Sequence, residues 1–396
     1  MIYSRSVFID EGVLDLNYVP PSLIHREKEL RFLSEAFRFI IAAPYEMSQR
    51  VIVVGNVGSG KTALAQRFGL NLMDDAKKRR IRARYIHLNC RELRGSLFLI
   101  LKRAMRMLKP GFPDRGYSSN ELLGFLIQTL DELDDQLVLC LDEVEALIEA
   151  EGANAIYYLT RVQEERIEEP RRLSLLLISK GLEAFRGLDK STLSTLQRNV
   201  ISLPEYTKPQ LADIIRSRAE SAFKPGSISE EAIDFVSELA ATEGGDARYA
   251  IDLLWRAGKY ADVNYSDRVS PEHIRQAAAT LFPSLREESV RQLSHHERLL
   301  LLAVARHFKH AKEMYASTGE VEQGYHVVCE EYGVPPRKHT QFWKYLNNLK
   351  SLDIVSIKLV TSPQGKTHII SLAKIPAEVL EKEVEHIIGQ SKAESS

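Results

Sequence analysis

The stretch Gly55-Asn56-Val57-Gly58-Ser59-Gly60-Lys61-Thr62 decides the fold of this chain. It follows the apolar run 51–54 and precedes a helical pattern, which is the strand, loop, helix order of a nucleotide phosphate site. Its glycines let backbone N–H groups converge on a β-phosphate, Lys61 can reach the β- and γ-phosphate oxygens, and the Thr62 hydroxyl can bind Mg²⁺. The stretch therefore predicts a phosphate and Mg²⁺ site in a parallel α/β domain.

A second apolar run, residues 137–141, ends in two carboxylates, Asp142 and Glu143. Ligands collect at the carboxyl ends of strands in open α/β sheets. We expect Asp142 to hold Mg²⁺ together with Thr62, and Glu143 to polarise the water that attacks the γ-phosphate. A third buried run ends in Ser179, which either contacts the γ-phosphate or the water, or simply ends a strand.

Composition limits the classes of function. The chain has 396 residues and a net charge of −1, from 53 Lys and Arg against 54 Asp and Glu, so it is not a wholly polybasic nucleic-acid binder. No apolar run approaches the ~20 residues that would span a bilayer. We expect a cytoplasmic, nucleoid-associated protein with no membrane partner. The three cysteines are scattered and predict buried reduced thiols: Cys90, Cys140 and Cys329.

The segments outside the predicted sheet are extended or helical. Residues 7–21 contain prolines and predict an extended segment that packs across another surface, and a helix from about residue 25 to Pro44 follows. Helices are expected at 210–222, 229–241 and 246–263. Arg248 lies at the start of the last one, where the helix N-terminus is already positive, so a phosphate between them would explain the arginine.

The C-terminal pattern is three helices followed by a hairpin, which predicts a winged helix. The third helix carries polar side chains suited to phosphates and base edges on one face, and Lys366 stands at the hairpin tip. Winged helices also serve as protein-interaction modules, and this alternative stays open. The candidate double-stranded DNA contacts here are Arg337, Lys338, Thr340, Lys344, Asn347, Asn348 and Lys366.

Taken together, these motifs resemble the archaeal replication initiators of the origin-recognition/cell-division-control family, which are AAA+ ATPases with a C-terminal winged helix. The resemblance covers almost the whole chain. It implies an AAA+ base at 1–203, a helical lid at 204–288 and a winged-helix domain at 289–396. It also implies ATP or ADP and Mg²⁺ as cofactors, and a replicative helicase and paralogous initiators as further partners.

The resemblance also implies roles for particular residues. Tyr18-Val19-Pro20 and His25-Arg26-Glu27 are similar to the family's adenine-side segment. Asn89-Cys90-Arg91 is similar to the end of its second strand. Gly245-Asp246-Ala247-Arg248 is similar to its sensor-2 segment, which places Arg248 on the γ-phosphate, and residues 109–117 fall where the family carries a DNA-contacting element. The implied contacts are Val19, Pro20, His25, Arg26, Tyr206 and Arg248 for nucleotide, and Lys109 and Arg115 for DNA.

Two positions depart from the family's pattern. Ser179 stands where relatives usually have the sensor-1 asparagine. Ser191 stands where the family's Leu-Asp-Pro-Arg segment carries an arginine finger, and neither Arg186 nor Arg198 is favoured as a substitute. Because a finger contributes 10³ to 10⁵ in rate in other NTPases, its loss predicts slow turnover.

We therefore expect an ATP-dependent origin-binding initiator with weak ATPase activity, in which nucleotide acts as a conformational switch. Lys61, Glu143 and Ser179 are its candidate catalytic residues. One alternative is a DNA-remodelling or branch-migration motor, against which the missing finger argues. Another is a non-hydrolysing DNA or transcription regulator, against which Glu143 argues, because a structural nucleotide site needs no water-positioning carboxylate.

Overall fold

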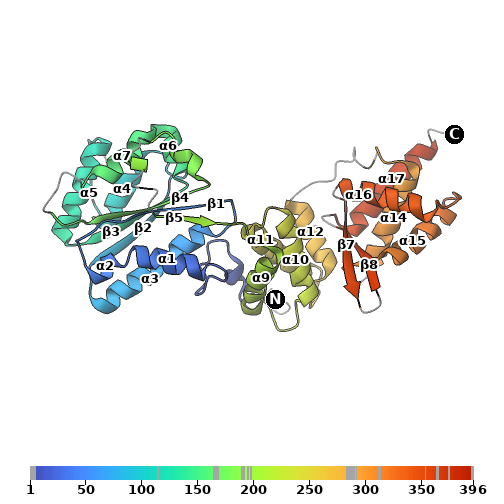
Figure 1. The fold of residues 1–396 in the computed structure, drawn as a ribbon. Helices are drawn as coiled ribbons and strands as arrows, with labels where there is room; N and C mark the ends of the chain where they lie inside the picture. The colour runs from blue at the N-terminus through green and yellow to red at the C-terminus, as the bar shows by residue number, and fades with distance from the viewer. Residues whose placement is uncertain are drawn as a thin grey trace. The chain divides into compact units, whose positions relative to one another are not determined.

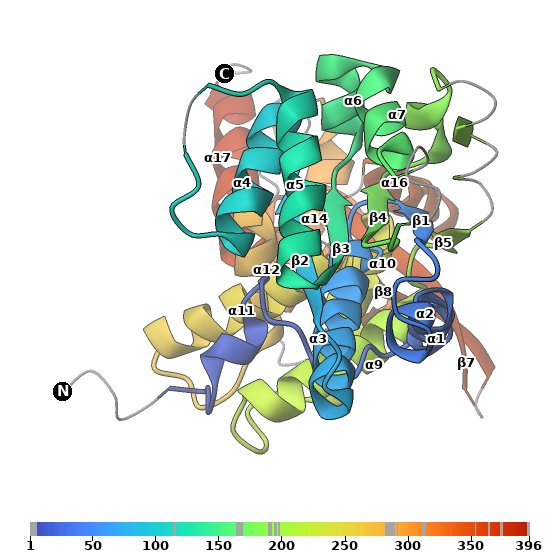
Figure 2. The same ribbon diagram turned by 90° about the vertical axis from the view of Figure 1, so that its left-hand side faces the viewer.

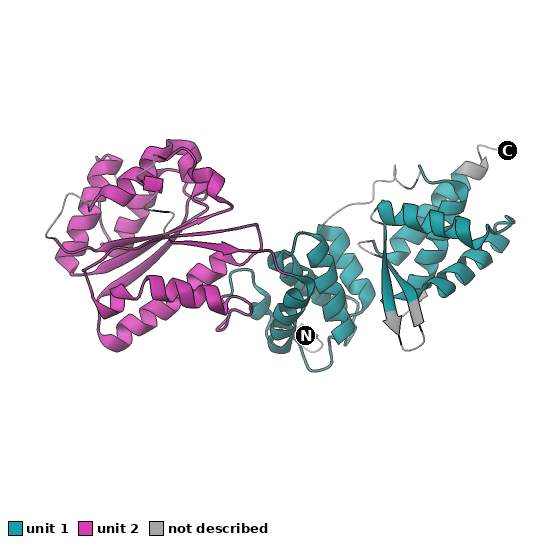
Figure 3. Ribbon diagram, in the orientation of Figure 1, with its two compact units in different colours: residues 1–18, 207–396 teal, residues 19–206 magenta. Residues whose placement is uncertain are grey.

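A computed structural model describes residues 6–113, 116–163, 169–188, 192–193, 196, 199–281, 290, 292–310, 314–352, 354–362, 365–372 and 375–393. The chain divides into two compact units, Val19–Tyr206 and a second unit of Met1–Tyr18 with Thr207–Ser396 (Figure 3). This division differs from the three expected domains, whose boundaries stay a prediction. No helix within the described ranges is long and apolar enough to cross a membrane.

The unit Val19–Tyr206 is built on a parallel five-stranded sheet in the order β2-β3-β4-β1-β5. Strands β1, β3 and β4 contain the apolar runs that predicted them, β2 was expected from its alternation, and β5 was not foreseen. The crossover connections are helical, as parallel pairing requires. The strands are β1 Arg50–Gly55, β2 Ala83–Asn89, β3 Gln136–Asp142, β4 Leu173–Ser179 and β5 Val200–Leu203.

Helices cover both faces of this sheet (Figure 1; Figure 2). Alternate strand residues point to opposite faces, so Val51 and Val53 pack with α1 to α3, whereas Ile52 and Val54 pack with α4 to α7. The expected helix from residue 25 is two helices, and α6 and α7 were not foreseen. The helices are α1 Glu27–Ala36, α2 Phe39–Ala42, α3 Lys61–Arg79, α4 Leu97–Leu108, α5 Ser119–Leu133, α6 Glu145–Glu151 and α7 Ala153–Arg161.

The second unit begins with an N-terminal arm, residues 6–18, that packs on a helical lid. Phe8 forms a bridge and a ring contact with Phe223, and Arg218 donates a hydrogen bond to the carbonyl of Val13. The arm crosses another surface as expected, although part of it is a 3-10 helix, η1 Glu11–Leu14. The lid helices are α9 Lys208–Ala222, α10 Glu230–Thr242, α11 Ala247–Val263 and α12 Pro271–Leu281.

The rest of the second unit is a winged helix with its own core. Three helices are followed by the β7–β8 hairpin, and short β6 adds a third antiparallel strand in the order β6-β8-β7. A final helix, α17, was not foreseen. The elements are α14 His295–His310, β6 Ala316–Ser317, α15 Thr318–Glu331, α16 His339–Ser351, β7 Val355–Ser362, β8 Gly365–Leu372 and α17 Ala377–Ala393.

The contact between arm and lid can be tested at Gly258 of α11. A Cβ added there would lie 2.2 Å from Cζ of Phe8. Such overpacking costs about 1–3 kcal/mol, so Gly258→Ala should lower the urea midpoint of unfolding. The control is Gly389→Ala in α17, where no described atom lies within 4 Å of the added Cβ. A Gly258→Ala midpoint equal to that of the control would contradict this packing.

Candidate functional site

The loop between β1 and α3 closes around the side chain of Lys61. The Lys61 ammonium donates hydrogen bonds to the carbonyl oxygens of Gly55 and Asn56, at 2.6 and 2.8 Å. Gly58 and Gly60 have φ of 74° and 93°, left-handed values that residues with a Cβ rarely adopt. Glycine-rich turns of this kind present backbone N–H groups to an anion at a helix N-terminus.

The loop has the properties that a phosphate group requires. The Ser59 hydroxyl oxygen is buried and has no hydrogen-bond partner among the described residues, which is costly unless a ligand supplies one. A Cβ on Gly60 would lie 2.7 Å from the Tyr206 hydroxyl, and one on Gly55 would lie 2.5 Å from the Leu203 carbonyl oxygen. Only glycine therefore fits at both positions, and the residues present suit the phosphates of a nucleotide.

Asp142 joins this loop to the end of β3. Its Oδ2 accepts a hydrogen bond from the Thr62 hydroxyl at 2.8 Å, and its Oδ1 accepts one from the Glu143 N–H at 2.9 Å. Burial would raise the pKa of Asp142, but hydrogen bonds from His87 and Thr62 outweigh burial and lower it. The carboxylate is therefore ionised, and with the Thr62 hydroxyl it forms an oxygen donor set that suits Mg²⁺.

His87 is a site residue that the sequence analysis missed. Its Nε2 lies 3.2 Å from Asp142 Oδ2, and its Nδ1 lies 3.4 Å from the Tyr85 hydroxyl. Tyr85 in turn donates to the carbonyl of Ala65 in α3, at 2.7 Å. The only sequence signal was the alternation along β2, which puts Tyr85 and His87 on one face. Hydrogen bonds of this type to a carboxylate orient it as a metal ligand.

Glu143 has a strained backbone conformation, and its side chain forms an ion pair with Arg91. Its φ is 52°, in the left-handed region, which costs of order 1–3 kcal/mol for a residue other than glycine. Arg91, just beyond β2, donates through Nε to Glu143 Oε2. The carboxylate predicted to polarise water is thus engaged by a cation in this conformation.

Ser179 lies at the same edge of the sheet. It ends β4, which lies between β3 and β1 in the strand order, and it is paired in register with Val54. The Ser179 hydroxyl donates to the carbonyl of Gly181 at 3.0 Å. Its oxygen can still accept a hydrogen bond, and its role toward the γ-phosphate or the water stays a prediction.

Arg26 connects the phosphate loop to the segment after β5. The buried guanidinium donates to the carbonyl oxygens of Ser59 at 3.1 Å and Pro204 at 2.5 Å, and it lies 4.1 Å from the ring centroid of Tyr206. Two of the six expected nucleotide contacts outside the loop, Arg26 and Tyr206, therefore adjoin the phosphate loop. Arg26 acts here through backbone contacts that no spacing in the sequence could reveal.

The other expected nucleotide contacts fall in two places. The Val19 carbonyl accepts a hydrogen bond from Arg67 of α3 at 2.9 Å, Pro20 is half-buried, and His25 has a φ of 64°. Arg248 is exposed in the first turn of α11, in the second compact unit. The contact of Arg248 with a nucleotide stays a prediction.

The third helix of the winged helix, α16, exposes four of the nine side chains expected to meet DNA. Thr340, Lys344 and Asn347 are exposed, whereas Phe342 and Leu346 are buried in the core, as the helical period requires. The Asn347 amide donates to the carbonyl of Trp343 at 2.9 Å. The exposed face is therefore polar along its length.

Several other DNA candidates are engaged in contacts of their own. Asn348 donates to Glu297 at 2.8 Å, Arg337 donates through Nε to His296 at 3.0 Å, and Lys109 lies 3.5 Å from Glu132. Lys338 is exposed just before α16. Arg115 and the side chain of Lys366 lie outside the described residues, although the Lys366 backbone pairs with Thr361.

The segment that departs from the family's arginine finger is described only in part. Leu188 is buried, and Arg186 is exposed beside Glu183. Ser191 and Arg198 lie outside the described residues. Nothing in the described part favours either arginine as a substitute finger.

Comparison with known proteins places the chain in a family. Three family profiles match: an AAA domain at 47–183, a Cdc6 AAA+ ATPase-type lid domain at 212–279 and a CDC6 C-terminal winged-helix domain at 288–382. ORC1-type DNA replication protein 2 of Sulfurisphaera tokodaii is 33% identical over 380 residues, which cover 94% of this chain and 91% of that protein. The chain belongs to the ORC1-type DNA replication proteins.

Solved structures of ORC1-type and Cdc6 proteins share the fold. The crystal structure of Cdc6p from Pyrobaculum aerophilum is 30% identical with a TM-score of 0.86, and the match covers 98% of this chain and 100% of that one. The Aeropyrum pernix ORC1 protein in complex with DNA is 30% identical with a TM-score of 0.64, covering 98% of each chain. The expected AAA+ base, helical lid and winged helix are thereby confirmed as the fold class.

The contact between His87 and Asp142 predicts an effect on Mg²⁺ affinity. Because residues that hydrogen-bond to metal ligands typically contribute about 10–100-fold in metal affinity, His87→Ala should raise the Mg²⁺ concentration needed for half-maximal binding of a fluorescent ATP analogue by about tenfold or more. Nucleotide binding without Mg²⁺ should stay unchanged. His326→Ala in α15 is the matched control. An unchanged Mg²⁺ midpoint for His87→Ala would contradict this role.

Proposed function

We propose that this ORC1-type protein is an ATP-dependent replication initiator that binds double-stranded DNA at origin-like sites in the cytoplasm. The observation that carries the proposal is the Thr62–Asp142 contact beside the phosphate loop, in a chain that also contains a winged helix. Nucleotide chemistry and DNA binding therefore reside in one polypeptide. Recruitment of a replicative helicase, with paralogous initiators as further partners, is part of the proposal.

In the proposed nucleotide site each side chain has one task. The loop N–H groups and Lys61 hold the phosphates, and Thr62 and Asp142 hold Mg²⁺, which when bound neutralises phosphate charge. Glu143 orients the attacking water and accepts its proton. Arg26 and Tyr206 keep the loop closed, and Arg248 contacts the γ-phosphate from the lid, with Val19, Pro20 and His25 flanking the base.

Slow hydrolysis is the second part of the proposal. Arg91 engages Oε2 of the Glu143 carboxylate and therefore competes with the attacking water for that oxygen. Ser191 occupies the expected finger position, and Ser179 replaces the sensor-1 amide. All three features favour a long-lived ATP state, which suits a switch that holds a DNA-binding shape better than a motor.

DNA binding is proposed to use the exposed face of α16 and the β7–β8 hairpin. An α-helix in the major groove supplies base contacts, and the wing contacts adjacent backbone. The similar Aeropyrum pernix ORC1 protein has been solved in complex with DNA. Most of the affinity should come from phosphate contacts and weaken steeply with salt.

The proposed roles of Glu143 and Arg91 can be separated by ATP turnover. Glu143→Gln should lower turnover by roughly 100-fold, the lower bound for general-base catalysis. Arg91→Ala should raise turnover, because it releases the Glu143 carboxylate. The matched control is Arg103→Ala, which removes an exposed arginine of α4 and should change nothing. Hydrolysis that does not depend on Glu143 would contradict the proposed ATPase.

The α16 face can be tested by fluorescence anisotropy with a labelled origin duplex at several salt concentrations. Lys344→Ala should weaken binding fairly uniformly across sequences and reduce the salt slope by about 1, as expected for one lost phosphate contact. Lys382→Ala removes a lysine of α17 that pairs with Glu378 and serves as control. If Lys344→Ala and Lys382→Ala behave alike, α16 does not face DNA.

A further inference from the structure

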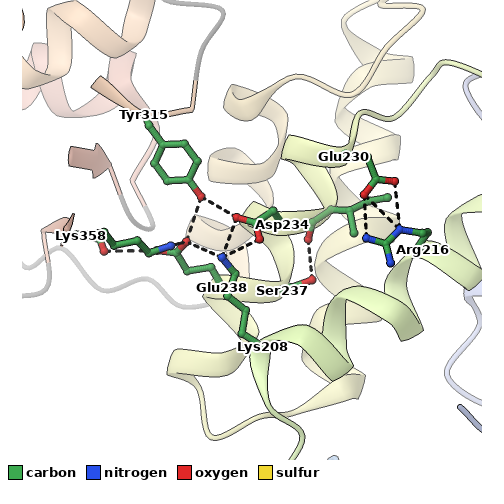
Figure 4. A network of polar contacts seen from close by, with 10 residues as sticks. Lys208, Arg216, Glu230, Asp234, Ser237, Glu238, Tyr315 and Lys358 are labelled. Atoms are coloured by element: carbon green, nitrogen blue, oxygen red, sulfur yellow. Dashed lines mark hydrogen bonds and ion pairs between the residues drawn. The ribbon is translucent and has the colours of Figure 1, made fainter. Parts of the chain in front are cut away.

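A polar cluster joins the lid to the winged helix within the second compact unit (Figure 4). Asp234 and Glu238 stand four residues apart on α10, so their carboxylates share one face of the helix. Tyr315, just before β6, and Lys358 of β7 approach this face from the winged helix, and Lys208 approaches it from the start of α9. We call these five residues the lid–wing cluster.

Lys208 holds the two carboxylates together from the lid side. Its ammonium lies 2.7 Å from Asp234 Oδ1 and 3.6 Å from Glu238 Oε2. Both carboxylates are therefore positioned by the lid itself. The lid therefore presents a pair of carboxylates that can bind a lysine ammonium, as a DNA phosphate does.

Three groups of the winged helix contact these carboxylates. The Tyr315 hydroxyl lies within hydrogen-bond distance of Asp234 Oδ2, at 3.2 Å, and of Glu238 Oε2, at 3.1 Å. The Lys358 ammonium contacts Glu238 Oε2 directly and lies 5.4 Å from the centroid of the Tyr315 ring. The Ser356 hydroxyl, two residues earlier on the same face of β7, reaches Glu238 Oε1 at 3.5 Å. One face of the wing strand is thus directed at lid carboxylates.

The contact between Lys358 and Glu238 removes water from both side chains. The Glu238 side chain is only 9% exposed, and that of Lys358 is 32% exposed. Burial and the nearby Lys208 ammonium lower the pKa of Lys358 to about 8, and Asp234 opposes this shift only partly. The Lys358 ammonium has therefore lost part of its hydration in this contact, and that loss offsets part of its attraction to Glu238.

A separate contact attaches the winged helix to the lid. Arg275 of α12 is fully buried, donates through Nε to the carbonyl of Leu372 at 3.4 Å, and lies 4.8 Å from the centroid of the Phe308 ring. Glu272 accepts a hydrogen bond from the N–H of Ala377 at 3.1 Å. Opening of the lid–wing cluster therefore need not detach the winged helix from the lid.

From this geometry we infer that the lid–wing cluster is an autoinhibitory contact, in which the carboxylates of α10 withhold Lys358 from DNA. The inference rests on the proposed DNA-binding function. While Lys358 contacts Glu238 it cannot neutralise a phosphate. Release of Lys358 from Glu238 adds one phosphate contact to the wing. The lid carboxylates then no longer compete with DNA for that lysine.

The test is duplex binding by the full chain, measured by anisotropy over a range of salt concentrations. Glu238→Gln should tighten binding several-fold and steepen the slope of log K against log salt by about 0.9, the value for one added phosphate contact. Glu230→Gln is the matched control, because it removes the same charge from α10 while its ion pair, with Arg216, stays within the lid. The control should leave the slope unchanged.

Two more variants complete the test. Lys358→Ala added to Glu238→Gln should cancel both the gain in affinity and the change in slope. Tyr315→Phe removes only a hydroxyl and should tighten binding by less than Glu238→Gln does. If Glu238→Gln fails to fold, Tyr315→Phe takes its place in the test. Weaker or unchanged binding by Glu238→Gln, or an equal gain for Glu230→Gln, overturns the inference. If the unchanged protein binds no duplex, the proposed function fails and the inference fails with it.

Discussion

The hydrogen bond between the Thr62 hydroxyl and Asp142 is the constraint on which the nucleotide site depends. It joins the first turn of α3 to the carboxyl end of β3, two elements 80 residues apart in the chain. Parallel pairing of β3, β4 and β1 brings their carboxyl ends to one edge, so Ser179 and the phosphate loop also lie there. His87 and Arg26 then restrain Asp142 and the loop from neighbouring elements.

Restraint of functional groups by opposite charge recurs in this protein. In the Val19–Tyr206 unit, Arg91 engages the Glu143 carboxylate at a residue with left-handed backbone. In the second unit, Glu238 engages Lys358 of the wing strand. In each case a charge for which we propose a role toward a ligand is paired with an opposite charge within the protein. This arrangement suits a protein whose activity depends on a change of state more than on rapid turnover.

Much of the fold could be predicted because local patterns determine it. The glycines and lysine at 55–62, the apolar runs that became β1, β3 and β4, and the helix period of α16 each act within a few residues. Apart from α17, the elements named as missed have weaker local signals. β5 is four residues long, α6 and α7 follow each other closely, and η1 interrupts a segment whose prolines predicted an extended chain.

The sequence by itself determined the phosphate loop, the acidic end of β3, the parallel sheet and the winged helix, because residue type and spacing suffice for each. Only the tertiary structure decided which side chains meet. His87 reaches Asp142 through strand register, Arg26 reaches the Ser59 carbonyl across 33 residues, and Glu238 reaches Lys358 across 120. Such contacts depend on how elements pack against one another, and no periodicity or motif within one element records that packing.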